Sequence, residues 1–425
     1  MTDPTPTPTA APGSTSDEEQ SRVGHDRDAS KHDTAGADVA PGLMQAQREA
    51  IEISGWGARF GFVQPHNACF WVFVFLLASG LWRLVGLVVP TGDVFAVANG
   101  TSLLTSGLFC VVFLIGLHWA DRWERTPGRL ALVAFLGGGL IATWAIALAG
   151  NDALRGIYSK LFGQPWAEDW RAGLAAPFVE ETAKGAIVLL MLGLAPVVIR
   201  TVYDGLIVGA YVGLGFQVFE DMLYGQNNAF AHFGVDQAGS VLDTFARRAA
   251  TGIASHALYT ALFAAGLIYL IGTVAQPRRV GRGVALIAAA LVVHGVWDNA
   301  AALGGGTIFA VVILVVVTLV SVVILFVAIR WGSNRERGYL QAILGPEVAN
   351  GTVTQPELEE LMVRRRPARA QRSVHRHVLT ALRDLGNAIA TDAHSQPSDH
   401  SDRVVEHARS EVVRLRETTR SRTGG

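Results

Sequence analysis

The chain has 425 residues, half of them hydrophobic and only 17% charged, with a formal net charge of −1 at pH 7 and a mean hydropathy of +0.32. Charged residues are scarce in long internal stretches and crowd the two ends, a distribution that excludes an ordinary soluble globular protein. The net charge says little about partners, because it averages an apolar block with charged tails. We expect a lipid bilayer as the surroundings and no nucleic acid as a partner.

The segment 1–50 is rich in Pro, Thr, Ala, Gly and Asp and has few large apolar side chains. Such a composition cannot bury enough surface to fold, so we predict a disordered N-terminal tail. It contains no basic stretch followed by an apolar run, and we therefore expect the first spanning helix to direct membrane insertion.

Eight apolar runs between residues 68 and 330 are long enough to cross about 30 Å of hydrocarbon. They lie near 68–89, 102–120, 130–149, 173–195, 200–224, 249–273, 283–303 and 307–330. The predicted fold class is therefore all-α, a polytopic membrane helix bundle of about eight transmembrane helices.

Arginine placement predicts the orientation of this bundle. Alternate connections contain arginines, namely Arg122, Arg125 and Arg129, then Arg200, then Arg278, Arg279 and Arg282. The connections 90–101 and 304–306 have neither Lys nor Arg, although the outer loop 150–172 does, and Arg247 and Arg248 begin the sixth run. The positive-inside rule then predicts a multi-pass protein of the cell membrane with both termini in the cytoplasm.

Residues 331–425 form a charged, arginine-rich tail that we expect in the cytosol. Amphipathic helices are predicted near 356–370, 373–391 and 401–419. In the last of these, apolar residues recur at helical spacing, namely Val404, Val405, Ala408, Val412 and Leu415. This stripe suits packing on a partner or on the membrane surface. The alternative is a loosely folded tail held near anionic lipid by its positive charge.

Two adjacent carboxylates stand in the fourth apolar run, at Glu180 and Glu181. On a helix, Glu180 and Lys184 lie one turn apart on the same face, and Glu181 can also reach Lys184. One carboxylate can thus be paired while the other stays free as a general base. A Glu–Lys pair that only holds two helices together is the structural alternative, and it explains one of the two carboxylates.

The next run carries a stripe of small residues at Gly205, Gly209 and Gly213, which predicts close packing of another helix. Glu220 follows near the outer end of this run. It supports the site if it faces inward, and the alternative is a carboxylate that snorkels to the membrane surface.

Histidines occur in the sixth and seventh runs, at His256 and His294. A lone histidine such as His256 is often a packing residue, but Asp298 lies four residues after His294 on the same helix face and can orient its imidazole. Imidazole nitrogens and carboxylate oxygens are ligands of catalytic zinc, although the spacing differs from the HExxH of soluble metalloproteases.

The polar residues of these four runs fall at a similar depth. With alternating helix directions, they lie roughly 6–15 Å below the outer surface, at about 1.5 Å per residue. Unrelated structural polar residues have no reason to share one layer. Ionisable groups in a bilayer are costly, so the layer marks a functional site.

The series of motifs in these runs resembles the PrsW family of intramembrane proteases, which is kin to the CAAX-prenyl endoproteases. The motifs are Glu180-Glu181-x-x-Lys184, Asp204-Gly205 with the glycine-rich run into Phe216-x-x-x-Glu220, His256, and His294-x-x-x-Asp298. The resemblance covers roughly residues 68–330, with its motifs within 177–298, and neither tail contributes.

This resemblance implies an intramembrane endopeptidase that cuts membrane-anchored proteins near their extracytoplasmic side, a site-1-type cleavage for which an anti-sigma factor is an example of a substrate. It implies that Glu180 and Glu181 are catalytic carboxylates, with Lys184, Glu220 and Asp298 supporting them. His256 and His294 would be zinc ligands together with Glu181, or would polarise the reacting groups in a glutamate-type mechanism. The sequence leaves both mechanisms open.

Two functions from other classes also fit polar residues inside a membrane. A proton- or cation-coupled transporter would keep Glu and His in mid-membrane, but we find no inverted repeat of the helices that carry the motifs. A catalytically silent scaffold is the other alternative, and the complete set of carboxylates and imidazoles disfavours it. The expected domain order is a tail at 1–50, a protease domain at 68–330 and a charged tail at 331–425.

Overall fold

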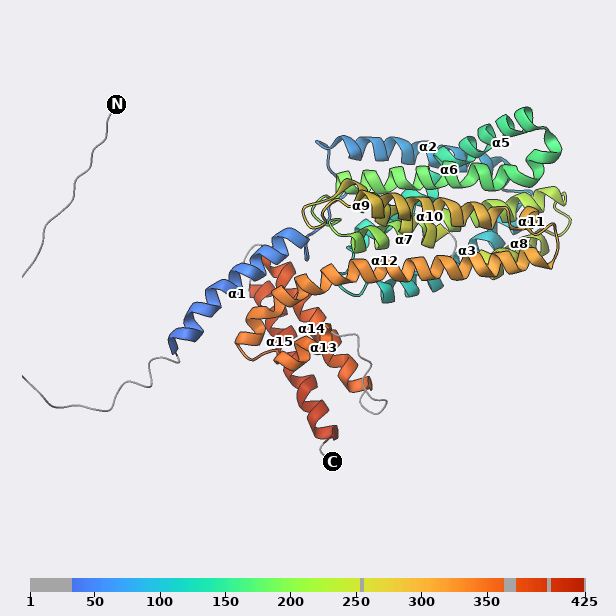
Figure 1. Ribbon diagram of the computed structural model, residues 1–425. Coiled ribbons are helices and arrows are strands. Elements are labelled where there is room, and N and C mark those ends of the chain that lie inside the picture. Colours follow the sequence, from blue (N-terminus) through green and yellow to red (C-terminus); the bar gives the residue numbers. More distant parts are fainter. Residues whose placement is uncertain (1–32, 253–255, 363–371, 396–398, 424–425) are drawn as a thin grey trace, which may run out of the picture. The chain divides into compact units, whose positions relative to one another are not determined.

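The computed structural model describes residues 33–252, 256–362, 372–395 and 399–423, and every regular element in these ranges is a helix (Figure 1). The first part of the bundle consists of α2 (Ala68–Thr91), α3 (Ala96–Ala120), and a continuous run of α4 (Gly128–Leu136), the π-helix η1 (Gly137–Ala147) and α5 (Leu148–Phe162). The second part consists of α6 (Gln164–Leu194), α7 (Val202–Ala231), α8 (Gln237–Gly252), α9 (His256–Ile271), α10 (Val280–Asp298), the short α11 (Ala300–Leu303) and α12 (Ile308–Ala349).

The prediction of a polytopic membrane helix bundle is confirmed. By length and composition, six helical stretches among the described residues can cross a membrane: α2, α3, the run Gly128–Phe162, α7, α10 and α12. The predicted spans in α6 and α9 fall outside this set, because α6 contains several charged side chains and α9 has only 16 residues. The count of eight spans therefore stays a prediction.

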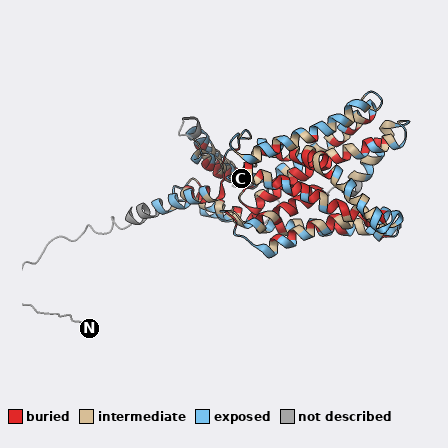
Figure 2. Ribbon diagram, turned by 90° about the horizontal axis from the view of Figure 1, so that it is seen from above, coloured by how far each residue is buried: buried red, intermediate tan, exposed pale blue. Residues whose placement is uncertain are grey.

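Helix α7 lies at the centre of the bundle. In its most apolar stretch 83% of the residues are buried by protein, whereas the value is 11% for each of α2, α3 and α12. Buried residues accordingly concentrate on the inner helices, and exposed ones on the outer helices (Figure 2). Since the exposed residues of the outer helices are largely apolar, these helices have the surface expected for contact with lipid.

The predicted small-residue stripe on α7 packs against α9. A Cβ atom at Gly209 would lie 2.6 Å from the carbonyl oxygen of Thr260, and one at Gly213 would lie 2.3 Å from that of His256. Only glycine allows so close an approach between the two backbones. The stripe therefore fixes the depth at which His256 faces α7.

The loop predicted at 150–172 is mostly helical, which corrects the sequence analysis. Helix α5 continues beyond the predicted span, and the chain reverses at Gly163, whose φ of +86° favours glycine. Beyond the turn, α6 begins at Gln164, with Pro165 in its first turn. This extension brings Asn151 of α5 beside α6.

The predicted helices of the C-terminal tail correspond to α13 (Gln355–Met362), α14 (Arg372–Ala393) and α15 (Asp399–Thr423), and residues 363–370 of the first prediction lie outside the described residues. Together with the end of α12 they enclose a second apolar core, to which the α15 residues Val405 and Val412 contribute. The alternative of a loosely folded tail does not describe these residues, because their apolar stripes pack on one another.

The predicted boundary of the N-terminal tail at residue 50 falls inside α1 (Asp33–Ser54). Ala50 and Ile51 are buried in the second core, and Gln47 donates a hydrogen bond of 2.6 Å to the carbonyl oxygen of Ile343. Order therefore begins before the predicted boundary. Residues 1–32 lie outside the described residues.

Candidate active site

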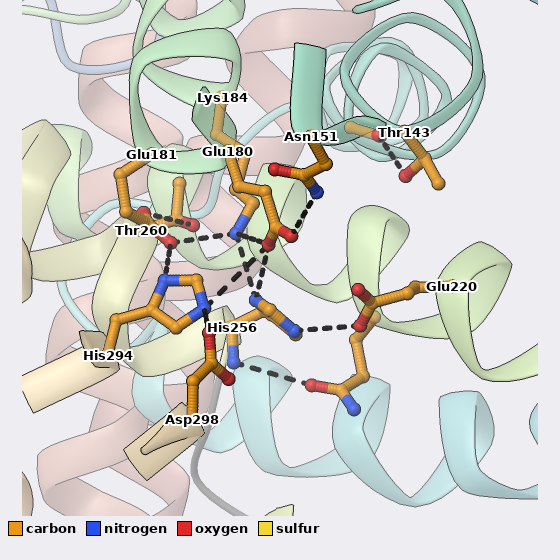
Figure 3. A network of polar contacts seen from close by, with 12 residues as sticks. Thr143, Asn151, Glu180, Glu181, Lys184, Glu220, His256, Thr260, His294 and Asp298 are labelled. Carbon is orange, nitrogen blue, oxygen red and sulfur yellow. Dashed lines mark hydrogen bonds and ion pairs between the residues drawn. The ribbon is translucent and has the colours of Figure 1, made fainter. Parts of the chain in front are cut away.

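The seven predicted site residues come together between α6, α7, α9 and α10, although up to 118 positions separate them in the chain (Figure 3). Glu180, Glu181 and Lys184 lie on α6, Glu220 on α7, His256 on α9, and His294 and Asp298 on α10. The three α6 side chains and His294 are almost completely buried. A charged cluster at such a position requires mutual pairing.

Lys184 and Glu181 form the innermost ion pair. The Lys184 ammonium donates a hydrogen bond of 2.7 Å to Glu181 Oε1, and neither side chain is exposed. The other oxygen, Oε2, accepts a hydrogen bond of 3.1 Å from the Thr260 hydroxyl. The Phe216 ring covers the ammonium, with its centroid 4.0 Å from Nζ. Both oxygens of Glu181 are therefore engaged.

Glu180 keeps one oxygen without a hydrogen bond. Its Oε1 accepts a hydrogen bond of 2.9 Å from the Asn151 side chain. Its Oε2 is buried and has no hydrogen-bond partner among the described residues. It lies 3.6 Å from Lys184 Nζ, 3.7 Å from His294 Nε2 and 3.8 Å from His256 Nδ1. The two imidazoles and the ammonium thus surround a carboxylate oxygen that is available for chemistry.

His256 is held by polar groups on both ring nitrogens. Nδ1 lies 2.9 Å from Lys184 Nζ, and Nε2 lies 3.0 Å from Glu220 Oε2. Glu220 also forms an ion pair of 2.5 Å with Arg248 of α8, which contacts Asp221 as well. Glu220 therefore faces the site and is only 9% exposed, which excludes the alternative of a snorkelling carboxylate. His256 is likewise a member of the cluster and not an isolated packing residue.

His294 is positioned by Asp298 and by Tyr259. Its Nε2 lies 3.5 Å from Asp298 Oδ2, as the four-residue spacing predicts, and its Nδ1 lies 3.1 Å from Glu181 Oε1. The Tyr259 ring stacks on the imidazole with a centroid distance of 5.1 Å. The two imidazole centroids are also 5.1 Å apart, so both histidines face the same small volume.

The residues suited to hold a metal are Glu180, His256 and His294. One ligand atom from each lies within 4.8 Å of the others. The predicted set of His256, His294 and Glu181 thus changes by one carboxylate, because the oxygens of Glu181 are engaged by Lys184 and Thr260. Two nitrogen donors and one oxygen donor fit catalytic zinc. A metal there would displace the Lys184 ammonium from His256 Nδ1, because both use the lone pair of that nitrogen.

The sequence analysis missed three residues of the site. Asn151 lies just beyond the third predicted span, and Arg248 stands at the start of the sixth. Thr260 follows His256 by one helical turn, a spacing that indicates a shared face. No comparable signal joins Asn151 or Arg248 to the site, since their contacts with Glu180 and Glu220 depend on the packing of α5 and α8.

Buried carboxylates and imidazoles enclosed by apolar helices are groups that hydrolytic chemistry inside a membrane requires. Residues 126–328 match the family model described as PrsW family intramembrane metalloprotease. This match supports a PrsW family intramembrane protease and, with it, intramembrane endopeptidase activity. No curated protein and no solved structure matches the chain significantly.

We predict that Lys184→Met lowers the free energy of unfolding by about 3–5 kcal/mol, because it leaves Glu181 buried without its counterion. Thermal unfolding of the purified protein in detergent measures the change. The double variant Glu181→Gln/Lys184→Met should recover part of the loss, whereas Lys160→Met, at an exposed position, should have little effect. Equal stability of the Lys184→Met and Lys160→Met variants would contradict a buried ion pair.

Proposed function

We propose that the chain is an intramembrane endopeptidase that hydrolyses peptide bonds of membrane-anchored proteins near the extracytoplasmic side, as in site-1 cleavage of an anti-sigma factor. The observation that carries this proposal is Glu180 Oε2, a buried carboxylate oxygen without a hydrogen-bond partner among the described residues. It faces nitrogens of both histidines at less than 4 Å.

Peptide hydrolysis at this site requires activation of water and stabilisation of the charge that develops on the carbonyl oxygen. In a site without metal, Glu180 accepts a proton as the water oxygen bonds to the carbonyl carbon, and the proton then passes to the leaving amine. His256 and His294 polarise the carbonyl oxygen. Glu181 and Lys184 fix the positive charge beside Glu180, and Asn151 sets the direction of its carboxylate. Glu220 and Asp298 orient the imidazoles.

Zinc is the cofactor that we propose, held by Glu180, His256 and His294. When bound, it would supply Lewis-acid activation of water and of the carbonyl group. The donor set and the similarity to a family described as metalloproteases support it, while Lys184 already places a positive charge beside the same atoms. Glu180 Oε2 cannot be a zinc ligand and a proton acceptor at once, so metal dependence decides its role.

We expect Glu180→Gln to reduce cleavage by a factor on the order of 10²–10⁴ while the protein stays folded, because an amide keeps the shape but can neither accept the proton nor bind zinc as a carboxylate does. The measurement is N-terminal proteomics of membranes from cells that express either form, scored by the loss of clipped membrane-anchored proteins. Glu168→Gln, on an exposed part of the same helix, is the matched control. Unchanged cleavage by Glu180→Gln would end the enzyme hypothesis.

For the metal, we expect close to one zinc per chain in the purified protein by elemental analysis. A chelator should remove both metal and activity, and added zinc should restore them. His256→Ala and His294→Ala should each lower the zinc content. An active, metal-free and chelator-insensitive protein would instead assign Glu180 as the proton acceptor and the histidines as hydrogen-bond donors, with a cost of roughly 10²–10³ in rate for removing one.

For the orientation, we propose that both termini lie in the cytoplasm of a cell-membrane protein. Arg122 after α3, Arg200 before α7 and Arg278 after α9 support this side. A topology reporter fused after Gly304 should be extracytoplasmic, and one fused after Gly351 should be cytoplasmic. Both reporters on one side of the membrane would contradict the arrangement and the proposed side of cleavage.

The competing functions receive less support. A transporter requires polar groups that lead across the membrane, whereas the seven site residues gather in one cluster. A silent scaffold gives no reason for a buried carboxylate oxygen that faces two imidazoles.

A further inference from the structure

An apolar groove lies between α3 and α12, and its lining includes Ala257, the residue after His256. Its volume is about 900 Å³, and α7 and α9 form its floor. The walls include Gly116 and Leu117 of α3 and Leu325 and Phe326 of α12, and the floor includes Ala261. We call this feature the α3–α12 groove. Its volume is that of a lipid-sized ligand and far exceeds the space of a few waters.

The groove covers only part of the membrane thickness. Along α3 it extends from Val112 to Ala120, and along α7 from Tyr203 to Ala210. At about 1.5 Å per residue each stretch is roughly 10–12 Å long, less than half of the 30 Å hydrocarbon layer. A spanning helix would find walls for part of its length only. Acyl chains from one leaflet match this extent.

Three arginines lie near the Trp123 indole at the polar end of the groove. Arg122 lines the groove, and its guanidinium lies 5.5 Å from the centroid of the Trp123 indole. Arg383 of α14 lies at the same distance from that ring. Arg337 of α12 also lies near the ring, at 5.7 Å, and donates a hydrogen bond to Asn334.

Arg122 and Arg383 have no anionic partner at bonding distance within the part of the chain that the structure describes. Among the described residues, no carboxylate forms an ion pair with Arg122 or Arg383. Arg383 Nε is buried and lacks a hydrogen-bond acceptor. Burial and the charge of Arg122 both lower the pKa of Arg383. The nearby Asp121 accepts a hydrogen bond from the Thr126 backbone, and Asp384 is exposed. Guanidinium groups bind phosphate through strong, paired hydrogen bonds.

We propose that the α3–α12 groove binds an anionic phospholipid of the leaflet on the arginine-rich side. Its acyl chains fill the groove, and its phosphate lies between Arg122 and Arg383. Trp119 and Tyr203, at the same end, suit the level of the lipid headgroups. The site links the C-terminal helices to the membrane, because Arg383 belongs to α14. The inference stands independently of the proposed function.

Native mass spectrometry of the full chain tests this proposal. The protein is purified in detergent and titrated with phosphatidylglycerol, phosphatidylcholine or glycerol 3-phosphate. We expect retention of phosphatidylglycerol, weaker retention of phosphatidylcholine and none of glycerol 3-phosphate. Arg122→Gln/Arg383→Gln should weaken phosphatidylglycerol binding about 25-fold, or about five-fold per arginine. Arg129→Gln/Arg279→Gln, which removes the same charge from exposed positions, should change it less than two-fold.

A second pair of variants tests the groove itself. Gly116→Leu fills it without a clash, since a Cβ there meets nothing within 4 Å. Gly107→Leu adds the same side chain to the same helix outside the groove and is the control. We expect only Gly116→Leu to reduce phosphatidylglycerol binding.

Three results would overturn the proposal. Equal retention of the two phospholipids would exclude the phosphate site, and so would unchanged binding by Arg122→Gln/Arg383→Gln. Photo-crosslinking from a benzophenone residue at position 116 that captures a membrane protein and no phospholipid would assign the groove to a protein segment. None of these outcomes depends on peptidase activity.

Discussion

The buried ion pair between Lys184 and Glu181 is the interaction on which the rest of the site depends. A charge in an apolar bundle is tolerated only when another charge or a set of dipoles neutralises it. Both carboxylate oxygens of Glu181 accept hydrogen bonds that offset its charge, one from Lys184 and one from Thr260. The adjacent Glu180 is thereby left with an oxygen that no described residue satisfies. Two adjacent carboxylates thus differ in the hydrogen bonds that their oxygens accept.

The glycine stripe of α7 gives this pair its imidazole partners. Close approach of α9 at Gly209 and Gly213 places His256 beside Lys184 and Glu220. A larger residue at either position would clash with the α9 backbone. Helix α9 would have to move away, and the hydrogen bonds of His256 would lengthen. The packing of α7 against α9 therefore also sets the positions of the polar groups in the site. The same packing supplies the floor of the α3–α12 groove, which ends at Ala257, the residue after the histidine.

The sequence by itself determined the class of the protein. Membrane-length apolar runs permit only helices, because lipid offers no partner for an open backbone, and an all-α bundle follows. Polar residues are costly in such runs, so those that occur there mark the site. For that reason Glu180, Glu181, Lys184, Glu220, His256, His294 and Asp298 could be selected without coordinates. The helical spacing of Glu181 with Lys184 and of His294 with Asp298 also predicted their contacts correctly.

Only the tertiary structure decided which carboxylate is free and which is engaged. Local spacing allows Lys184 to reach either glutamate, and the choice depends on Thr260, Asn151 and the two histidines, which come from three other helices. For this reason Glu180, and not Glu181, is the carboxylate that we propose as a metal ligand. Helix α5 and the Arg248 contact were likewise hidden from the sequence. Periodicity reports which face of a helix is apolar, but it does not report which neighbour covers that face.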